Sequence, residues 1–287
     1  MKIIDALADK KLFISLYNRF VIYAPYALII DGEIFDEYIA GFSRDDDRRI
    51  LIGAVGDEYG IVHFGVQNGD AGMIYILFSD SNSIAIELAK IAEKWFIEKG
   101  ARIIKAYIGC ASPYQYILHG SETYCWAGNY HANNAFARLG YDLDLDVIVM
   151  SKKLQPAAPA INNRLDGFVI REETERDDRL ALAGTYTAYV EGEWAGRCGY
   201  HFLRAISGRL GKKYGQIDIW LDQKYHATEL SGGVLALAHN ALSVAGVERV
   251  MLATNQALFR AVRFYEKNGY EAEPIRAYSY SKSLTKH

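Results

Sequence analysis

One segment of the chain combines residue types that favour anion binding. Residues 215–221 alternate apolar and polar side chains, which predicts a half-buried strand. A helix is expected at Ser231–Ala245, with Ser231 as its N-cap and with Gly232 and Gly233 in its first turn. Unpaired amides and the helix dipole attract anions at such a helix start, and glycines let a ligand approach the backbone. The segment is therefore either a phosphate-binding loop or a plain loop before a capped helix.

Length and composition set the class of protein. The chain has 287 residues, 51% of them hydrophobic, which is enough for two domains. A net charge of −3 argues against a nucleic-acid binder that relies on bulk charge. Three cysteines are too few for a disulfide scaffold. The start, Met1–Asp5, lacks a signal-peptide pattern, and the longest apolar stretch, Phe20–Ile30, is too short to cross a bilayer. We expect a cytoplasmic protein.

The composition changes near the middle of the chain. The segment Lys152–Leu165 contains two prolines, small alanines and paired asparagines, and it shows no helical or strand periodicity. It predicts a linker at 154–165 between a first domain, 1–153, and a second domain, 166–287.

The two halves share one order of elements, namely hairpin, strand, helix, strand, helix and strand. The first half has them at Ile50–Val66, Met73–Phe78, Ser83–Lys99, Ala101–Ile108 and Asn133–Met150, and the second at Thr187–Phe202, Gly215–Leu221, Ser231–Ala245, Val247–Thr254 and Phe259–Glu273. Each half is predicted to be an α/β unit, with helices on a mixed sheet.

The segment AVRFYEKNGYEAE resembles the GNAT (GCN5-related N-acetyltransferase) superfamily, which transfers an acyl group from coenzyme A to an amine. The resemblance covers Arg171 to the end and, more weakly, Ile50–Met150. It implies two GNAT-like domains in tandem, each a mixed, mostly antiparallel twisted sheet flanked by helices.

The resemblance also implies where coenzyme A binds. In this family its pyrophosphate rests on a helix N-terminus after the fourth strand, at Arg/Gln-x-x-Gly-x-Gly/Ala. Here His226 stands in place of the arginine and Glu229 in place of the first glycine. A carboxylate near two phosphates weakens binding unless it points outward or is paired. The implied site comprises Leu221, Asp222, Gln223, His226, Ala227, Thr228, Glu229, Leu230, Ser231, Gly232, Gly233, Asn255 and Tyr265. The matching segment of the first half, Ser79–Leu88, is shorter and has no glycine.

Tyr265 matches the family tyrosine that protonates the departing coenzyme A thiolate. Taken alone, it is equally a helix aromatic that packs on the sheet. The first half has Phe136 at the matching position, where no proton can be donated. It keeps the family's Asn-x-x-Ala spacing with Asn129, whereas the second half has Asn255 nearby.

The attacking amine must lose a proton, so a base is expected. We expect Asp218 and Glu193 to be the catalytic residues, and Asp222 and His201 are further candidates for the base. The resemblance implies that backbone amides near Leu221–Gln223, where the fourth and fifth strands separate, polarise the acyl carbonyl.

Two other features admit more than one interpretation. The long segment Ile108–Tyr130 is rich in aromatic residues and either lines an acceptor pocket or fills a seam between the halves. Its cysteines and histidines, Cys110, His119, Cys125 and His131, match no common zinc spacing, so no metal is expected. The charged run Arg171–Arg179 predicts solvated surface, where the family's first helix, which lines the acceptor site, begins.

We therefore expect an acetyl-CoA-dependent N-acetyltransferase. Its second half would bind acetyl-CoA and acetylate an amine of a small molecule or peptide by direct attack in a ternary complex, without nucleic acid or membrane partners, as a monomer or homodimer. The alternative is a non-catalytic GNAT-like scaffold, a ligand sensor or partner binder, with decayed coenzyme A sites. A third possibility places the active cleft in the first half, at Asn129.

Overall fold

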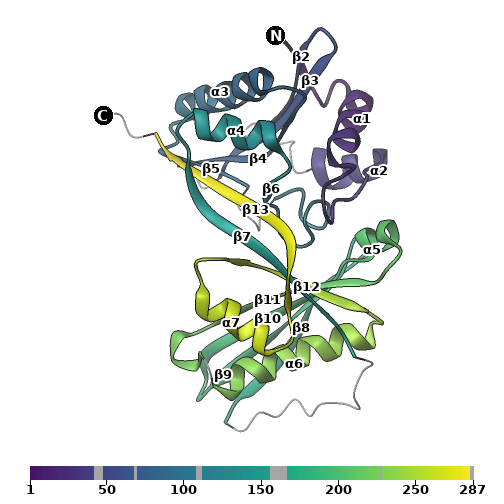
Figure 1. Ribbon diagram of the computed structural model, residues 1–287, viewed down its shortest axis with the longest axis vertical. Helices are drawn as coiled ribbons and strands as arrows, with labels where there is room; N and C mark the ends of the chain where they lie inside the picture. Colours follow the sequence, from purple (N-terminus) through teal and green to yellow (C-terminus); the bar gives the residue numbers. More distant parts are fainter. Residues whose placement is uncertain (42–47, 68–69, 108–111, 156–166, 227, 285–287) are drawn as a thin grey trace. The chain divides into compact units, whose positions relative to one another are not determined.

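The computed structural model describes residues 1–41, 48–67, 70–107, 112–155, 167–226 and 228–284 (Figure 1). Within these residues, thirteen strands form one mixed sheet in the order β1-β2-β3-β4-β5-β13-β7-β12-β11-β10-β9-β8, with β6 paired to β13. The chain divides into two compact units. Unit 1 comprises Met1–Val147 and Ile275–His287, and unit 2 comprises Ile148–Pro274.

The elements follow the chain in this order. Unit 1 contains β1 (Lys2–Asp5), α1 (Lys10–Val21), α2 (Gly32–Ile34), a π-helical turn (Phe35–Ala40), β2 (Arg48–Val55), β3 (Glu58–Gln67), β4 (Ala71–Ser79), α3 (Asn82–Glu98), β5 (Ile103–Ala106), β6 (Cys125–Trp126), α4 (Tyr130–Arg138) and the start of β7 (Asp142–Lys153). Unit 2 contains the end of β7, β8 (Val169–Asp177), β9 (Leu182–Val190), β10 (Glu193–Phe202), α5 (Arg204–Leu210), β11 (Tyr214–Leu221), a 3-10 turn (Gln223–Tyr225), α6 (Glu229–Val244), β12 (Arg249–Asn255), α7 (Phe259–Lys267) and the start of β13 (Glu271–Ser283).

The long strands β7 and β13 each belong to both units. β7 starts in unit 1 and continues into unit 2 from Ile148, whereas β13 starts in unit 2 and continues into unit 1 from Ile275. They are neighbours in the sheet and run side by side in Figure 1. Each half of the sequence therefore gives its last strand to the sheet of the other half.

Unit 1 has helices on both faces of its sheet. α3 and α1 both contact β3 and β4, and Figure 1 shows these two helices on opposite sides of those strands. Gly60 and Gly72 let α3 approach closely, because a Cβ at either glycine would collide with a side chain of that helix. On the other face, Tyr17 of α1 stacks on Tyr114, with ring centroids 5.9 Å apart.

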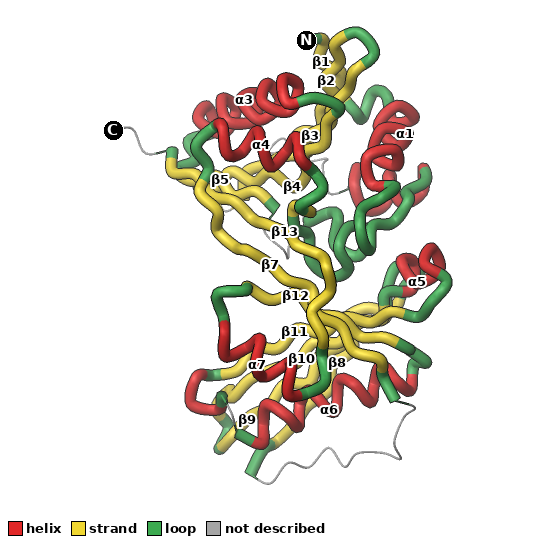
Figure 2. Tube along the Cα trace, viewed as in Figure 1, coloured by secondary structure: helices red, strands yellow, loops and turns green. Residues whose placement is uncertain are grey.

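Unit 2 has α6 and α7 on one face of its sheet, as Figure 2 shows. Leu230, Val234 and Leu237 of α6 are buried in one core cluster with Tyr265 of α7. Ile217 of β11 belongs to the same cluster. Successive residues of a strand point to opposite faces, so the polar residues between the apolar ones of β11 face away from these helices.

The predicted fold class is confirmed. Both predicted hairpins form, and the parallel pairs β4–β5 and β11–β12 sit among antiparallel ones. Two local expectations are wrong. Ser231 is not an N-cap, because α6 begins two residues earlier at Glu229. The run Arg171–Arg179 does not begin a helix, because most of it forms the edge strand β8; its charged residues are largely exposed, which agrees with the predicted solvated surface.

Candidate functional site

A gap opens between β11 and β12 in unit 2. The parallel pairing is registered at Tyr214–Arg249, Gly215–Val250 and Gln216–Met251, although β11 continues to Leu221 and β12 to Asn255. The amide of Asp222 donates to the carbonyl of Ala195 on β10, at 3.0 Å. Because alternate amides of a strand point to opposite edges, the amides of Ile219 and Leu221 point toward β12 and into the gap.

The loop after β11 bends back on itself. Oδ1 of Asp222 accepts a hydrogen bond from the amide of Lys224 and caps the 3-10 turn that contains Gln223. Nε2 of His226 lies 3.2 Å from the carbonyl oxygen of Leu221, so this exposed ring folds over the end of β11. The amide nitrogen and Oδ1 of Asp222 are thus both hydrogen-bonded within the protein. Of the predicted backbone donors, Leu221 is the one whose amide points into the gap. Ala227 lies outside the described residues.

The N-terminus of α6 has no side-chain cap. Thr228 occupies the N-cap position, but its hydroxyl donates to the carbonyl of Tyr225 at 2.8 Å. The hydroxyl of Ser231 donates to the carbonyl of Thr228, also at 2.8 Å. Both hydroxyls therefore bond carbonyl oxygens; the amide of Ser231 also donates to Thr228, and neither hydroxyl caps the amides of Glu229 and Leu230. This arrangement suits an anionic ligand.

The side chains in the first turn of α6 divide by exposure. Leu230 is fully buried in the core and holds the helix on the sheet, whereas Glu229 is exposed. A Cβ on Gly232 would meet nothing within 4 Å, so this position opens onto free space. Gly233 is half-buried on the same turn. Glu229 also meets the condition under which a carboxylate is tolerated near phosphates, because it points outward.

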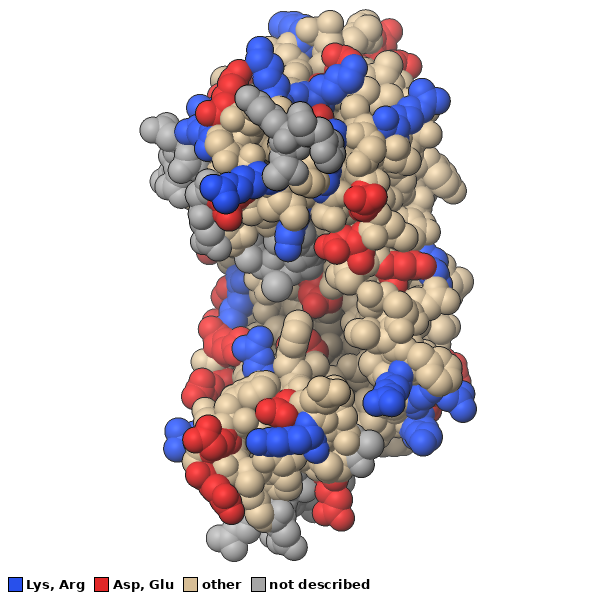
Figure 3. All heavy atoms as spheres, turned by 90° about the vertical axis from the view of Figure 1, so that its left-hand side faces the viewer, with Lys and Arg blue, Asp and Glu red and all other residues tan. Residues whose placement is uncertain are grey.

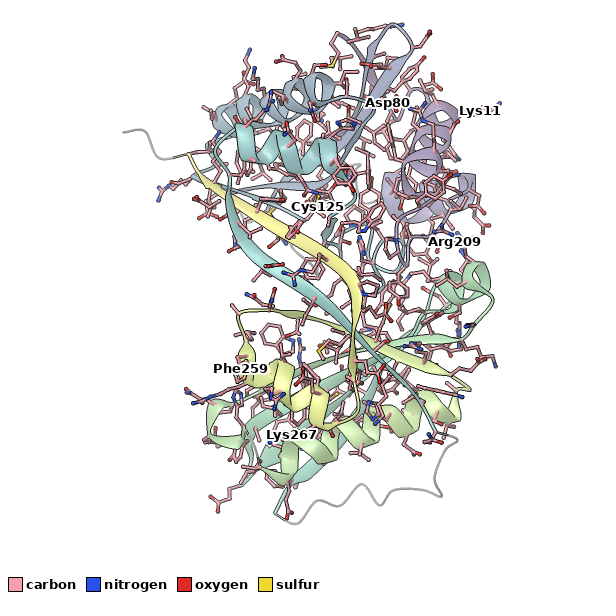
Figure 4. All side chains as sticks on the ribbon, viewed as in Figure 1. Lys11, Asp80, Cys125, Arg209, Phe259 and Lys267 are labelled. Atoms are coloured by element: carbon pink, nitrogen blue, oxygen red, sulfur yellow. The ribbon has the colours of Figure 1, made fainter. Side chains whose placement is uncertain are left out.

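Tyr265 lies near the C-terminal end of α7, two residues before Lys267; the first and last residues of this helix are labelled in Figure 4. It is 7% exposed, and its ring centroid lies 5.4 Å from that of Phe264 and 5.7 Å from that of Tyr270. Asn255 ends β12, and its Oδ1 accepts from the amide of Ala257 at 3.0 Å, which shapes the turn into α7. Its side chain thus has a structural partner.

The structure brings two of the candidate bases together. Nε2 of His201 lies 2.9 Å from Oδ1 of Asp218 on the neighbouring strand. Burial alone would raise the pKa of Asp218, but hydrogen bonds from His201 and Trp220 and the charges of His201 and Arg197 lower it. Asp218 is therefore ionised at neutral pH and weakly basic. Glu193 is exposed at the start of β10, apart from this pair along the strand.

In unit 1 the corresponding gap is filled. The ladder between β4 and β5 ends at Ile74–Ala106, and the next residue, Tyr107, has φ 55°. Its hydroxyl accepts from the amide of Leu77 at 2.7 Å and donates to the carbonyl of Leu77 at 2.8 Å. Burial raises its pKa well above the usual value. Nothing in the sequence singles out Tyr107, because it is one of 21 tyrosines and belongs to no motif.

Asn129 joins the same cluster. Its Nδ2 donates to the carbonyl of Leu77 at 2.8 Å and to the hydroxyl of Tyr107 at 3.3 Å. It is 9% exposed. Phe136, which stands in place of a tyrosine, is fully buried and packs edge-on against Tyr107. These contacts give Asn129 a structural role in closing the gap.

The aromatic segment after β5 packs inside unit 1. Tyr114 and Ile117 are fully buried, and Tyr114 contacts α1. Cys125, labelled in Figure 4, is buried, and its Sγ lies 3.2 Å from Oδ1 of Asn133. Cys110 lies outside the described residues. Among the residues that the structure describes, no group of three or more His, Cys, Asp or Glu could hold a metal ion.

On the face drawn in Figure 3, acidic and basic side chains are interspersed rather than gathered by sign. In the described part of the chain, no helix is both long and apolar enough to span a membrane.

Comparisons with known proteins show that this chain is similar to solved structures. No family model matches the sequence, and no curated protein matches it. A tandem GNAT protein from the clavulanic acid biosynthesis pathway is similar over 100% of this chain and 99% of its own, with TM-score 0.64 and 12% identity. A GCN5-related N-acetyltransferase from Sphaerobacter thermophilus is similar over 88% of this chain and 86% of its own, with TM-score 0.55 and 14% identity.

A third similar structure is a GCN5-related glucosamine N-acetyltransferase region of a fungal multi-domain GH3 β-N-acetylglucosaminidase. The match covers 98% of this chain and 38% of that protein, with TM-score 0.67 and 11% identity. At these identities the likeness concerns the fold. The chain has the fold of the tandem GNAT proteins, as the resemblance in its sequence predicted.

Proposed function

We propose that unit 2 is an acetyl-CoA-dependent N-acetyltransferase domain. The observation that carries the proposal is the contrast between the two gaps. In unit 2 the gap between β11 and β12 leads to the uncapped start of α6, whereas in unit 1 the hydroxyl of Tyr107 occupies the backbone groups of Leu77. The tandem GNAT fold supports this reaction class.

Backbone amides of unit 2 would hold the acetyl-CoA. The pyrophosphate of acetyl-CoA would accept hydrogen bonds from the first amides of α6, where the helix dipole also favours negative charge. The thioester arm would enter the gap, where the amides of Ile219 and Leu221 are placed to polarise the carbonyl oxygen. Glu229, at the exposed start of α6, would point away from the phosphates.

The chemical step would be a direct acyl transfer. The lone pair of the acceptor nitrogen attacks the thioester carbon, the carbon–nitrogen bond forms, and the carbon–sulfur bond breaks. The amine loses one proton and the coenzyme A thiolate gains one, so the products are an acetamide and free coenzyme A. Tyr265 would protonate the thiolate, with His201, oriented by Asp218, or water accepting the proton from the amine.

Unit 1 would serve as a degenerate partner domain. Its gap is closed by Tyr107 and Asn129, and α3 starts at Asn82, directly after the short turn that follows β4. We propose that it supports unit 2 through the exchanged strands. On this proposal the boundaries 1–153 and 166–287 mark the sequence repeats, and the linker 154–165, of which residues 156–165 lie outside the described part, connects them.

The test is thermal unfolding of the full chain with coenzyme A, combined with an assay for thiol release from acetyl-CoA. A ligand at 100 times its Kd should stabilise the folded state by about 2.7 kcal/mol. A shift together with amine-dependent thiol release supports the transferase. A shift without release with any amine favours a ligand sensor, and no shift at millimolar coenzyme A favours a partner-binding scaffold.

A further inference from the structure

In the part of unit 2 that the structure describes, the connection between the first two strands forms no helix, unlike the connection in unit 1. There, the chain between β1 and β2 forms α1, which packs against β3 and β4. In unit 2, β8 ends at Asp177 and β9 starts at Leu182, so the described residues between them form only a short turn. Among the described residues, this connection therefore adds no helix to the face opposite α6, and Trp220 on that face is 61% exposed.

The strand register places side chains of different charge on this face in two adjacent rows. Arg171, Thr187, Arg197 and Trp220 pair across β8, β9, β10 and β11. In the next row along the strands, Glu173, Thr185, Gly199 and Asp218 pair in the same way. Alternate residues of a strand share a face, so a basic and aromatic row lies directly beside an acidic row.

Asp218 is held at the centre of this arrangement. Its Oδ1 accepts a hydrogen bond from His201, and the nearby indole of Trp220 helps to lower its pKa. Gly199 makes room for it, because a Cβ there would overlap the carboxylate. Its side chain is still 26% exposed. The carboxylate can therefore accept a further cationic group.

Arg197 supplies the opposite charge. It is exposed, and among the described residues it forms no ion pair within 4 Å. Its charge nevertheless acts on Asp218. Neighbouring rows on one face lie about 6.6 Å apart along a strand. The long, flexible side chain of Arg197 lets its guanidinium come closer than this to the carboxylate of Asp218. A free guanidinium, a carboxylate and an aromatic face are thus grouped within the size of one small molecule.

We propose that this face binds the acceptor, and that the acceptor is an amine with an adjacent carboxylate and an apolar side chain, as in an aromatic α-amino acid. The acceptor's amino group would lie at Asp218, its carboxylate at Arg197 and its apolar part on Trp220. This inference rests on the proposed transferase function of unit 2.

The experiment compares three amines with the full chain and acetyl-CoA, measuring thiol release. Phenylalanine has all three groups, phenethylamine lacks the carboxylate, and alanine lacks the aromatic ring. We expect kcat/KM for phenylalanine to exceed that for each of the others by about 10- to 100-fold, the range of a charge-assisted hydrogen bond or a buried ring. Arg197→Gln should abolish the preference over phenethylamine, and Arg197→Lys should restore part of it.

Matched variants separate recognition from general damage. Trp220→Ala should lower kcat/KM for phenylalanine more than for alanine. Arg263→Gln removes another exposed arginine of unit 2, one paired with Glu266, and should leave all three values unchanged. Equal rates for phenylalanine and phenethylamine, or an unchanged preference in Arg197→Gln, overturn the acceptor class. Coenzyme A binding without turnover of any of the three overturns it as well, whereas absence of coenzyme A binding overturns the transferase proposal itself.

Discussion

The hydroxyl of Tyr107 bonds both backbone groups of Leu77, accepting from its amide at 2.7 Å and donating to its carbonyl at 2.8 Å. One side chain thus replaces the missing strand partner where β4 and β5 separate. In unit 2, the residue that matches Leu77 on the sheet face toward the helices is Ile219, and its amide points into an open gap. The two halves share a fold, but among the described residues only in unit 1 are the backbone groups at this strand edge hydrogen-bonded by a side chain of the protein itself.

Replacing Tyr107 with Phe should therefore cost stability and not activity. Tyr107→Phe leaves the buried amide of Leu77 without its acceptor, whereas the carbonyl keeps its bond from Asn129, and the free energy of unfolding should fall by about 1–3 kcal/mol. Urea denaturation measures this. Tyr23→Phe removes an exposed hydroxyl and is the control.

The same variant tests which half binds coenzyme A. Calorimetry of the wild type and of Tyr107→Phe should give one coenzyme A per chain in both proteins. A stoichiometry of two in the wild type, or loss of binding in Asn129→Ala, would place a site in unit 1.

Tyr265→Phe tests the proposed proton donor. We expect kcat to fall by about 10²- to 10⁴-fold with little change in coenzyme A affinity, because the hydroxyl acts on the leaving thiolate and not on the bound phosphates. Tyr270→Phe is the matched control, since its hydroxyl lies 2.6 Å from Nε2 of His239 and has a structural partner. Unchanged turnover in Tyr265→Phe would remove this residue from the mechanism.

Two helical glycines separate helix propensity from ligand approach. A Cβ at Gly232 in α6 or at Gly208 in α5 would meet nothing within 4 Å. Alanine at either position should raise stability by up to about 1 kcal/mol. Only Gly232→Ala should weaken coenzyme A binding, because it places a methyl group where the ligand approaches the first turn of α6. Equal coenzyme A affinities in the two variants would argue against a phosphate at this turn.

Glu229 offers a change in the opposite direction. Its carboxylate favours the helix dipole but repels a bound pyrophosphate. Glu229→Gln should lower the free energy of unfolding by about 0.3–1 kcal/mol while tightening coenzyme A binding. The tightening should decrease in high salt, because the side chain is exposed. Weaker binding in Glu229→Gln would show that the carboxylate assists the ligand.

Local patterns explain how much of this architecture could be predicted. The alternation in β11 and the apolar stripe of α6 each report burial within a few residues, and both elements form within one or two residues of their predicted bounds. The helix α6 begins at Glu229, two residues before the predicted start at Ser231. Leu230 is fully buried in the core, and the helix includes it. Ser231 therefore lies inside the helix.

The exchange of β7 and β13 could not be predicted from the same patterns. A strand is marked by its own side chains, whereas its neighbours in the sheet are set by pairing between distant segments. Tyr107 shows the same limit within the site. Nothing in its flanking residues indicates that its hydroxyl reaches across to Leu77, and only the arrangement in space reveals that unit 1 is closed.

Buried histidines make stability depend on pH. Burial lowers the pKa of His63 to about 3 and that of His119 to about 4, while burial and the charge of Lys152 lower that of His239 to about 4. Their unfolded pKa is about 6.5, so between pH 6.5 and about 4 the unfolded chain takes up protons that the folded chain excludes. The free energy of unfolding should fall as the pH decreases through this window, by about 1.4 kcal/mol per pH unit for each histidine.

A single replacement isolates one of these contributions. In His239→Gln the amide can still bond the hydroxyl of Tyr270, but it does not titrate. Urea denaturation at several pH values between 6.5 and 4.5 should give a slope that is shallower than in the wild type by about 1.4 kcal/mol per pH unit. Carboxylates titrate in both proteins, so their effect cancels in the difference. Parallel slopes would mean that His239 is protonated in the folded protein, contrary to its burial beside Lys152.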